Sequence, residues 1–209
     1  MEITPLPELI ESLALKGIVF AFDAINTQKK TIAMIVDSGN HYLAALKGNQ
    51  PTLYRTVRQQ FTPHQSVCTL NKGHGRIEKR TVSICPFNSF LAGWNSITTA
   101  IRVESQRITK YKYETETRYY ISDLQETVED FAYRIRGYWG VENQAHYCKD
   151  VTLGEDKSRI RTEPLPQIWS IARNLTLNLY RDAGFNNMAQ AKRKSQFGLK
   201  HLFYLFRMK

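Results

Sequence analysis

The sequence predicts an α/β fold with an antiparallel β insertion and a basic, helical C-terminal region. Three observations carry this prediction. Apolar strands alternate with amphipathic helices over residues 18–60, Thr, Val, Ile and Tyr dominate residues 75–124, and helical periodicity returns from Thr127. We expect a first domain over residues 1–156, with the insertion at about 70–125, and a basic helical region over residues 157–209.

The first strands and helices follow from apolar spacing. IVFAFDA, at residues 18–24, is a short apolar run that ends in Asp23, as expected of a buried strand with an acid at its carboxyl end. TQKKTIAMIVDSG has helical spacing and stops at Gly39, and HYLAALKG then forms a second strand. This order predicts a parallel pair. PTLYRTVRQQF predicts a further helix that begins at Pro51.

The middle of the chain changes from helical to strand periodicity. RIEKRTVSI, SITTAIRVESQRIT and ETETRYYISDL alternate in part and predict antiparallel strands. VEDFAYRIRGYWGVENQAHYCKD predicts one long helix with soft interruptions at Gly137 and Gly140. IWSIARNLTLNLYRD predicts another helix, and a basic run followed by an amphipathic segment ends the chain.

The net charge of +10 is concentrated at one end. Residues 157–209 hold eleven lysines and arginines against two acids, which indicates a polyanionic partner such as DNA, with Lys192, Arg193 and Lys194 as candidate contacts. A solvated basic tail is the alternative. Three widely spaced cysteines argue against a disulfide framework or a structural zinc site. With neither signal-peptide pattern nor apolar span, we expect a cytoplasmic protein without a membrane partner.

An acidic stretch, GVENQAHYCKDVTLGED at residues 140–156, stands out in this basic chain. On an α-helix, Glu142, His146 and Lys149 share one face at i, i+4 and i+7. The alternative is a surface Glu142–His146 pair worth ~0.2–0.5 kcal/mol. A carboxylate such as Asp23 at the end of a buried strand is costly unless it is paired or binds a metal. Together with Glu142 it could bind Mg²⁺. The alternative is that Asp23 caps a helix that begins near Asn26.

Several blocks resemble one family. DAINTQKKTIAMIVDSGNHYLAALKGNQPTL, HGRIEKR and RIRGYWGVENQAHYCKDVTLGEDKSRIR are similar, in order and spacing, to bacterial insertion-sequence transposases of the ISAs, or H-repeat-associated, type. The resemblance implies a DDE transposase with a partial RNase H-like fold, in which Asp23 and Glu142 bind Mg²⁺ or Mn²⁺ and cut and rejoin DNA at transposon ends.

The resemblance also assigns supporting residues. Tyr133, Arg136, Glu142 and Lys149 are similar to a tyrosine, arginine, glutamate, lysine signature of related transposases, although the gap from Arg136 to Glu142 is longer than usual. It implies that Arg136 and Lys149 contact DNA phosphates. Asp150 is expected to support Lys149 or His146.

One departure from the family pattern limits the expected activity. The family's first aspartate lies in a DGK-type strand upstream of the region where this chain begins, so we expect a truncated transposase that is inactive alone and whose Asp23 strand has an unpaired side. Two alternatives remain open. One is a non-catalytic DNA-binding fragment that forms homo-oligomers or inhibits full-length transposase; the other is an RNase H-like nuclease in which Asp150 or Asp156 replaces the missing aspartate.

Overall fold

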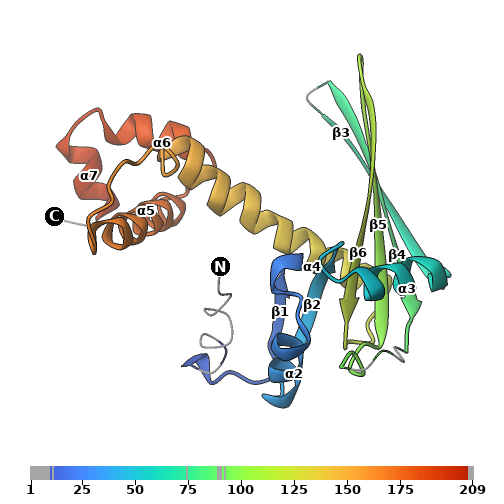
Figure 1. Ribbon diagram of the computed structural model, residues 1–209. Helices are drawn as coiled ribbons and strands as arrows, with labels where there is room; N and C mark the ends of the chain where they lie inside the picture. Colours follow the sequence, from blue (N-terminus) through green and yellow to red (C-terminus); the bar gives the residue numbers. More distant parts are fainter. Residues whose placement is uncertain (1–9, 11, 74, 89–90, 92, 207–209) are drawn as a thin grey trace. The chain divides into compact units, whose positions relative to one another are not determined.

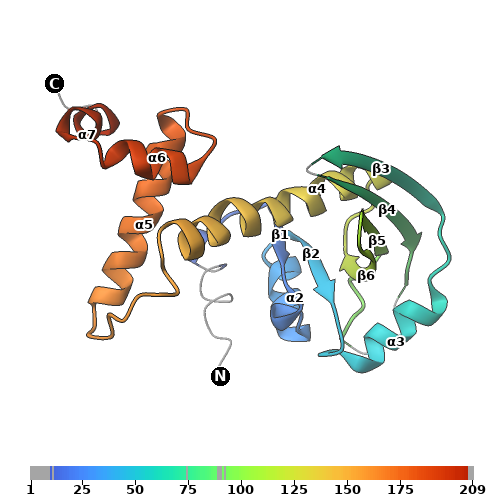
Figure 2. The same ribbon diagram turned by 90° about the horizontal axis from the view of Figure 1, so that it is seen from above.

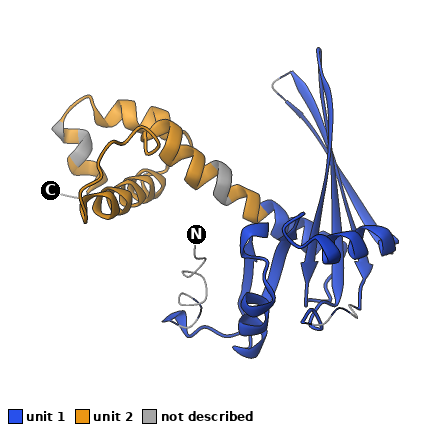
Figure 3. Ribbon diagram, viewed as in Figure 1, with its two compact units in different colours: residues 1–136 blue, residues 137–209 orange. Residues whose placement is uncertain are grey.

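The computed structural model describes residues 10, 12–73, 75–88, 91 and 93–206; side chains are described for these except at 141–143, 199, 201 and 202. The chain forms two compact units, residues 1–136 and 137–209, which are coloured blue and orange in Figure 3. We describe each unit by itself. Among the described helices, none combines the length and apolarity that a membrane crossing needs.

A six-stranded mixed sheet organises the first unit, with the order β1-β2-β6-β5-β4-β3. Its strands are β1 Val19–Phe22, β2 His41–Leu46, β3 Gln65–Gly73, β4 Arg76–Pro86, β5 Thr99–Thr109 and β6 Tyr113–Ser122. The predicted parallel pair is confirmed as β1 and β2, whereas the other pairs are antiparallel. The predicted insertion is therefore not a separate sheet, because β6 hydrogen-bonds directly to β2.

The parallel pair is formed through helix α2, Lys29–Asp37. Thr31, Ile32 and Ile35 give this helix a buried face at helical spacing. Gly39 ends it in a left-handed conformation with φ of 76°, and the amides of Gly39 and Asn40 donate to Val36 and Ile35 in a Schellman motif. The chain then enters β2. Helix α3, Pro51–Gln60, begins at its proline as predicted.

Two helices cover one face of the sheet. Ile32 and Ile35 of α2 and Leu53 and Val57 of α3 pack in one core with sheet residues Phe22, Tyr42, Ala44, Leu46, Ala100, Tyr119 and Ile121. Their burial removes apolar surface from water, and each Å² of apolar surface buried stabilises the fold by roughly 25 cal/mol.

The opposite face, which we call the α4 face, carries buried Leu43, Ala45, Ile101, Val103 and Tyr120. Helix α4, Val128–Val141, begins in the first unit, and its Val128, Phe131 and Ile135 are at most 3% exposed. Figure 2 shows the sheet between α2 and α3 on one side and α4 on the other. The outer halves of β3 to β6 extend past the helices as a twisted arm (Figure 1).

The second unit is helical. After π-helical turns at Glu142–His146 and Cys148–Thr152, it contains α5 Leu165–Asp182, α6 Met188–Ser195 and α7 Leu199–Leu205. Its core joins Leu177, Tyr180, Met188, Ala191 and Leu205. The predicted helix at residues 168–182 is confirmed, and the basic run at residues 192–194 lies in the last turn of α6.

β1 lies at one end of the sheet, and on its outer side no strand is paired with it within the described part of the chain. Only four residues long, β1 keeps its register with β2 from Val19 against His41 to Phe22 against Ala44. The first unit therefore presents the strand that leads to Asp23 at an open sheet edge.

Candidate active site and nucleic-acid interface

Asp23 follows β1 directly, at the carboxyl end of the parallel pair. Phe22 points into the core beneath α2, so alternation along the extended chain puts Asp23 on the α4 face. It precedes a short 3₁₀ turn, Ala24–Asn26, without forming a side-chain capping hydrogen bond there. Asp23 thus occupies the N-cap position of this turn, as the capping interpretation expects, but its side chain does not make the capping hydrogen bond. Its carboxylate faces a cation instead.

That cation is Lys47, the residue after β2. Its Nζ lies 3.1 Å from Oδ1 and 3.4 Å from Oδ2 of Asp23, and both side chains are about half exposed. The parallel register explains the contact, because Phe22 lies beside Ala44 and both chains run on in the same direction. Ends of parallel strands are the usual location of sites in α/β sheets.

The ionisation of Asp23 follows from these neighbours. Burial raises the pKa of its carboxyl group, but the backbone amide of Ala24, the ammonium of Lys47 and the guanidinium of Arg118 together outweigh burial and hold the pKa below its usual value. Asp23 is therefore a carboxylate at neutral pH. A half-exposed anion with two hard oxygen atoms is the kind of ligand that Mg²⁺ prefers.

A divalent ion at Asp23 would meet Lys47 first. The ammonium lies within 3.4 Å of both carboxylate oxygens, so an ion that bound both oxygens would have to displace Lys47. Among the described side chains, no three His, Cys, Asp or Glu residues gather in a way that could hold a metal ion. Asp23 thus fits one ligand position, and the side chain of Glu142 lies outside the described part of the chain.

The helix that carries Glu142 differs from the prediction. α-helical winding ends at Val141, and residues 142–146 and 148–152 are π-helical. A π-helix closes its hydrogen bonds at i+5, so i, i+4 and i+7 no longer define one straight stripe. Lys149 therefore leaves the expected face: His146 is exposed, whereas the Lys149 side chain is 15% exposed, and the side chain of Glu142 lies outside the described part of the chain.

Lys149 belongs to an internal ion-pair group of the second unit. Its Nζ and the guanidinium of Arg173 each lie 3.6 Å from one oxygen of Glu155. The carboxylate beside Lys149 is thus Glu155, whereas Asp150 was expected in that position. All three side chains are at least three-quarters buried, and the group joins the turn after the π-helical segment to Arg173 of α5.

The other predicted residues lie on helix surfaces. Tyr133, on α4, is 82% exposed, and Arg136 is exposed one turn further along. Lys192, Arg193 and Lys194 are exposed on α6, where Lys192 also donates to the carbonyl of Thr152 and Lys194 lies over the Phe185 ring.

Two arginines on the α4 face, Arg118 beside Asp23 and Arg80 beside Arg118, were not predicted. Arg118 on β6 interacts electrostatically with Asp23, and Arg80 on β4 interacts with both Arg118 and Arg136. For the segments that contain both arginines we predicted strand structure and no functional residue. Arg80 closes the HGRIEKR block, but the pairing of β4 and β6 through β5 that brings the two arginines near each other leaves no local signal in the sequence.

Comparisons with known proteins show the family of this chain. Residues 2–179 match the protein family described as "Transposase DDE domain". The matched range contains Asp23, the ionised aspartate at the end of the parallel pair β1–β2. It also contains the antiparallel arm into which the sheet continues. The chain therefore belongs to the DDE transposase family, and the predicted resemblance is confirmed.

Individual relatives carry related names. The chain is 34% identical over 193 residues to "H repeat-associated putative transposase YhhI" of Escherichia coli K12, covering 85% of this chain and 51% of that protein. It is 33% identical over 195 residues to "Putative transposase YncI" of Escherichia coli O157:H7, covering 87% and 50%. The chain spans about half the length of these relatives. No solved structure gives a significant match.

Proposed function

We propose that this chain acts in DNA transposition as the part of a DDE transposase that supplies Asp23 and Glu142 to an RNase H-like catalytic centre. One observation carries the proposal. Within a chain that matches the family over residues 2–179, Asp23 is an ionised carboxylate at the carboxyl end of the parallel pair β1–β2. The reaction would be attack of water or a DNA 3′ hydroxyl on a phosphodiester, with transfer between DNA strands.

Mg²⁺ or Mn²⁺, when bound, would activate the attacking oxygen and stabilise the leaving oxygen. The chain's own groups would prepare that step. Asp23 would offer a carboxylate oxygen as ligand, and Glu142 is proposed as the second. Lys47 holds Asp23 ionised before an ion arrives. Arg136 and Lys149 are proposed to contact DNA phosphates, which for Lys149 requires release from its ion pair with Glu155. Tyr133, His146 and Asp150 are proposed in supporting positions.

A count of ligands limits what this chain can do alone. Two divalent ions about 3.5–4 Å apart need several carboxylate oxygens to offset their charge. Asp23 and Glu142 offer only two carboxylates. We therefore expect the chain alone to bind a divalent metal ion without cleaving DNA. Cleavage is expected only when another chain supplies a further carboxylate.

The test combines metal binding and cleavage. Mn²⁺ should raise the melting temperature of the chain, and Asp23→Asn should reduce this shift, whereas Asp37→Asn, at the end of α2, should leave it unchanged. Labelled DNA should stay intact with the chain and Mn²⁺. The remaining part of the relative YhhI, supplied as a second chain, should produce cleavage that Glu142→Ala removes.

A second candidate is a DNA-binding role without cleavage, favoured by the exposed basic turn of α6. In that case the triple change of Lys192, Arg193 and Lys194 to Gln should abolish DNA binding. Neither Mn²⁺ nor the remaining part of YhhI should then produce cleavage. Cleavage by the chain alone that is lost on Asp150→Ala or Asp156→Ala would instead support the nuclease alternative. An Mn²⁺ shift that is insensitive to Asp23→Asn would refute the proposed centre.

A further inference from the structure

Arg80, Arg118 and Arg136 form a group on the α4 face that we call the arginine cluster. β5 lies between β4 and β6: Arg80 pairs with Ser105 across one boundary, and Val103 pairs with Arg118 across the other. Arg80 and Arg118 therefore lie on the same face, one side-chain step apart, with Cα atoms roughly 12 Å from each other. Both side chains are partly buried.

Arg136 completes the cluster from α4. It follows the fully buried Ile135, which fixes this turn of the helix in the first unit. Besides burial, repulsion from the guanidinium of Arg136 lowers the pKa of Arg80. Two strands and a helix, far apart in sequence, thus hold three like charges together.

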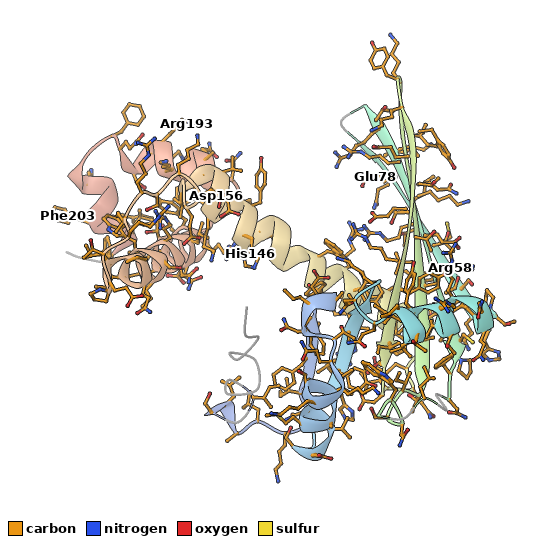
Figure 4. The ribbon with its side chains drawn as sticks, in the orientation of Figure 1. Arg58, Glu78, His146, Asp156, Arg193 and Phe203 are labelled. Carbon is orange, nitrogen blue, oxygen red and sulfur yellow. The ribbon has the colours of Figure 1, made fainter. Side chains whose placement is uncertain are left out.

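Arg80 differs from the paired arginines around it. Arg76 lies 2.9 Å from Glu78, Arg118 lies 2.6 Å from Glu116, and Arg102 lies 3.1 Å from Glu104. Glu78 also attracts Arg80 but makes its ion pair with Arg76; Figure 4 shows Glu78 on the extended arm of the sheet. No ion pair of Arg80 is found among the described side chains.

This arrangement costs free energy in the absence of a ligand. Burial lowers the pKa of Arg80, and repulsion from Arg136 and Arg118 acts in the same direction against weaker attraction by Tyr120 and Glu78. A half-buried guanidinium held against two others needs an anion to offset desolvation and repulsion. Planar guanidinium groups match the oxygens of a phosphate in a bidentate manner.

The cluster is continuous with the candidate active site. Arg118 interacts with Asp23, whose carboxylate binds Lys47. The antiparallel register that pairs Leu46 with Tyr119 puts Lys47, which follows Leu46, beside Arg118, which precedes Tyr119. A phosphate held by the cluster would therefore lie close to the ionised carboxylate at which chemistry is proposed.

We propose that Arg80, Arg118 and Arg136 bind a backbone phosphate of the DNA strand that enters the Asp23 site. This inference rests on the proposed function and deepens it, because it assigns DNA contacts to the β arm as well as to the helices. Arg80 is the central residue, since it has two guanidinium neighbours and makes no ion pair with a carboxylate among the described side chains.

The experiment compares Arg80→Gln with Lys79→Gln in the full chain. Lys79 is a matched control because it is the adjacent exposed residue of β4, lies on the opposite face, and changes the net charge equally. Binding to a labelled DNA duplex of mixed sequence is measured against salt. Arg80→Gln should weaken binding roughly tenfold. It should also reduce the slope of log affinity against log salt by about one, whereas Lys79→Gln changes both much less.

A stability measurement separates binding from structure. Without ligand, Arg80→Gln should leave the melting temperature unchanged or higher, because a repelled charge is removed. Inorganic phosphate should raise the melting temperature of the wild type more than that of Arg80→Gln. A lower melting temperature without phosphate would indicate a structural role for Arg80 and would overturn the proposal.

The outcomes distinguish the two proposals. If the wild type binds DNA and both variants weaken it equally, the arginine cluster is not a phosphate site, although DNA binding stands. If the wild type does not bind DNA, but phosphate protects it through Arg80, the anion site stands and the proposed function fails. If neither DNA nor phosphate distinguishes Arg80→Gln from Lys79→Gln, the cluster has no anion-binding role.

Discussion

Asn40 determines where β1 begins, and its replacement by alanine tests how the Asp23 strand is held. This side chain is 3% exposed. Its Oδ1 accepts from the amide of Ile18 at 3.0 Å, and its Nδ2 donates to the carbonyl of Leu15 at 2.7 Å and to Ser38 Oγ at 2.9 Å. One side chain thus joins the turn after α2 to the segment that enters β1.

The expected cost follows from the groups left behind. Asn40→Ala removes the partners of one backbone donor and one backbone acceptor, and an unsatisfied buried group costs about 1–3 kcal/mol. Leu15 and Ile18 are 43% and 40% exposed, so water can reach part of these groups and the lower half of the range applies. We expect a loss of about 2 kcal/mol in the free energy of unfolding, which corresponds to roughly 4–8 °C in melting temperature.

Urea denaturation followed by the fluorescence of Trp94 gives a reading of the first unit. Trp94 is 3% exposed in the core of that unit, and replacing Trp139 and Trp169 by Phe leaves it as the single tryptophan. Asn71→Ala, at an exposed position of β3, is the control and should change stability by less than about 0.5 kcal/mol. An equally small effect of Asn40→Ala would refute the reasoning that its hydrogen bonds hold β1 in place.

Two further predictions concern the same unit. Phe131→Ala, at a fully buried position of α4, should lower the free energy of unfolding by about 3–5 kcal/mol in urea, whereas Tyr133→Ala, 82% exposed on the same helix, should change it little; equal effects would show that α4 does not cover the sheet. The folded pKa of Asp23 is lowered from 3.8, so the stability from its Lys47 pair is present above that pH and is lost as pH falls through the lower value. Because the pair is half exposed, this amounts to at most about 1 kcal/mol, and acid titration of thermal stability should show a loss that is absent in Asp23→Asn.

Much of the local structure could be predicted because local physics determines it. The apolar run before Asp23, the helical spacing of Ile32 and Ile35, and Gly39 at the helix end each act within a few residues. The strand β3, Gln65–Gly73, was not predicted. Its side chains are almost all exposed, so it has no alternation of apolar residues, and its strand conformation depends on pairing with β4.

Sequence by itself determined the parallel pair, the acid at its end and the family to which the chain belongs. Only the tertiary structure decided which groups surround that acid. Lys47 meets Asp23 because β1 and β2 pair in parallel, Arg118 is brought to them because β6 pairs with β2, and Arg80 and Arg136 join Arg118 because β5 and α4 bring distant segments to one face. Such pairings depend on burial summed over the whole sheet, which no short stretch of sequence encodes.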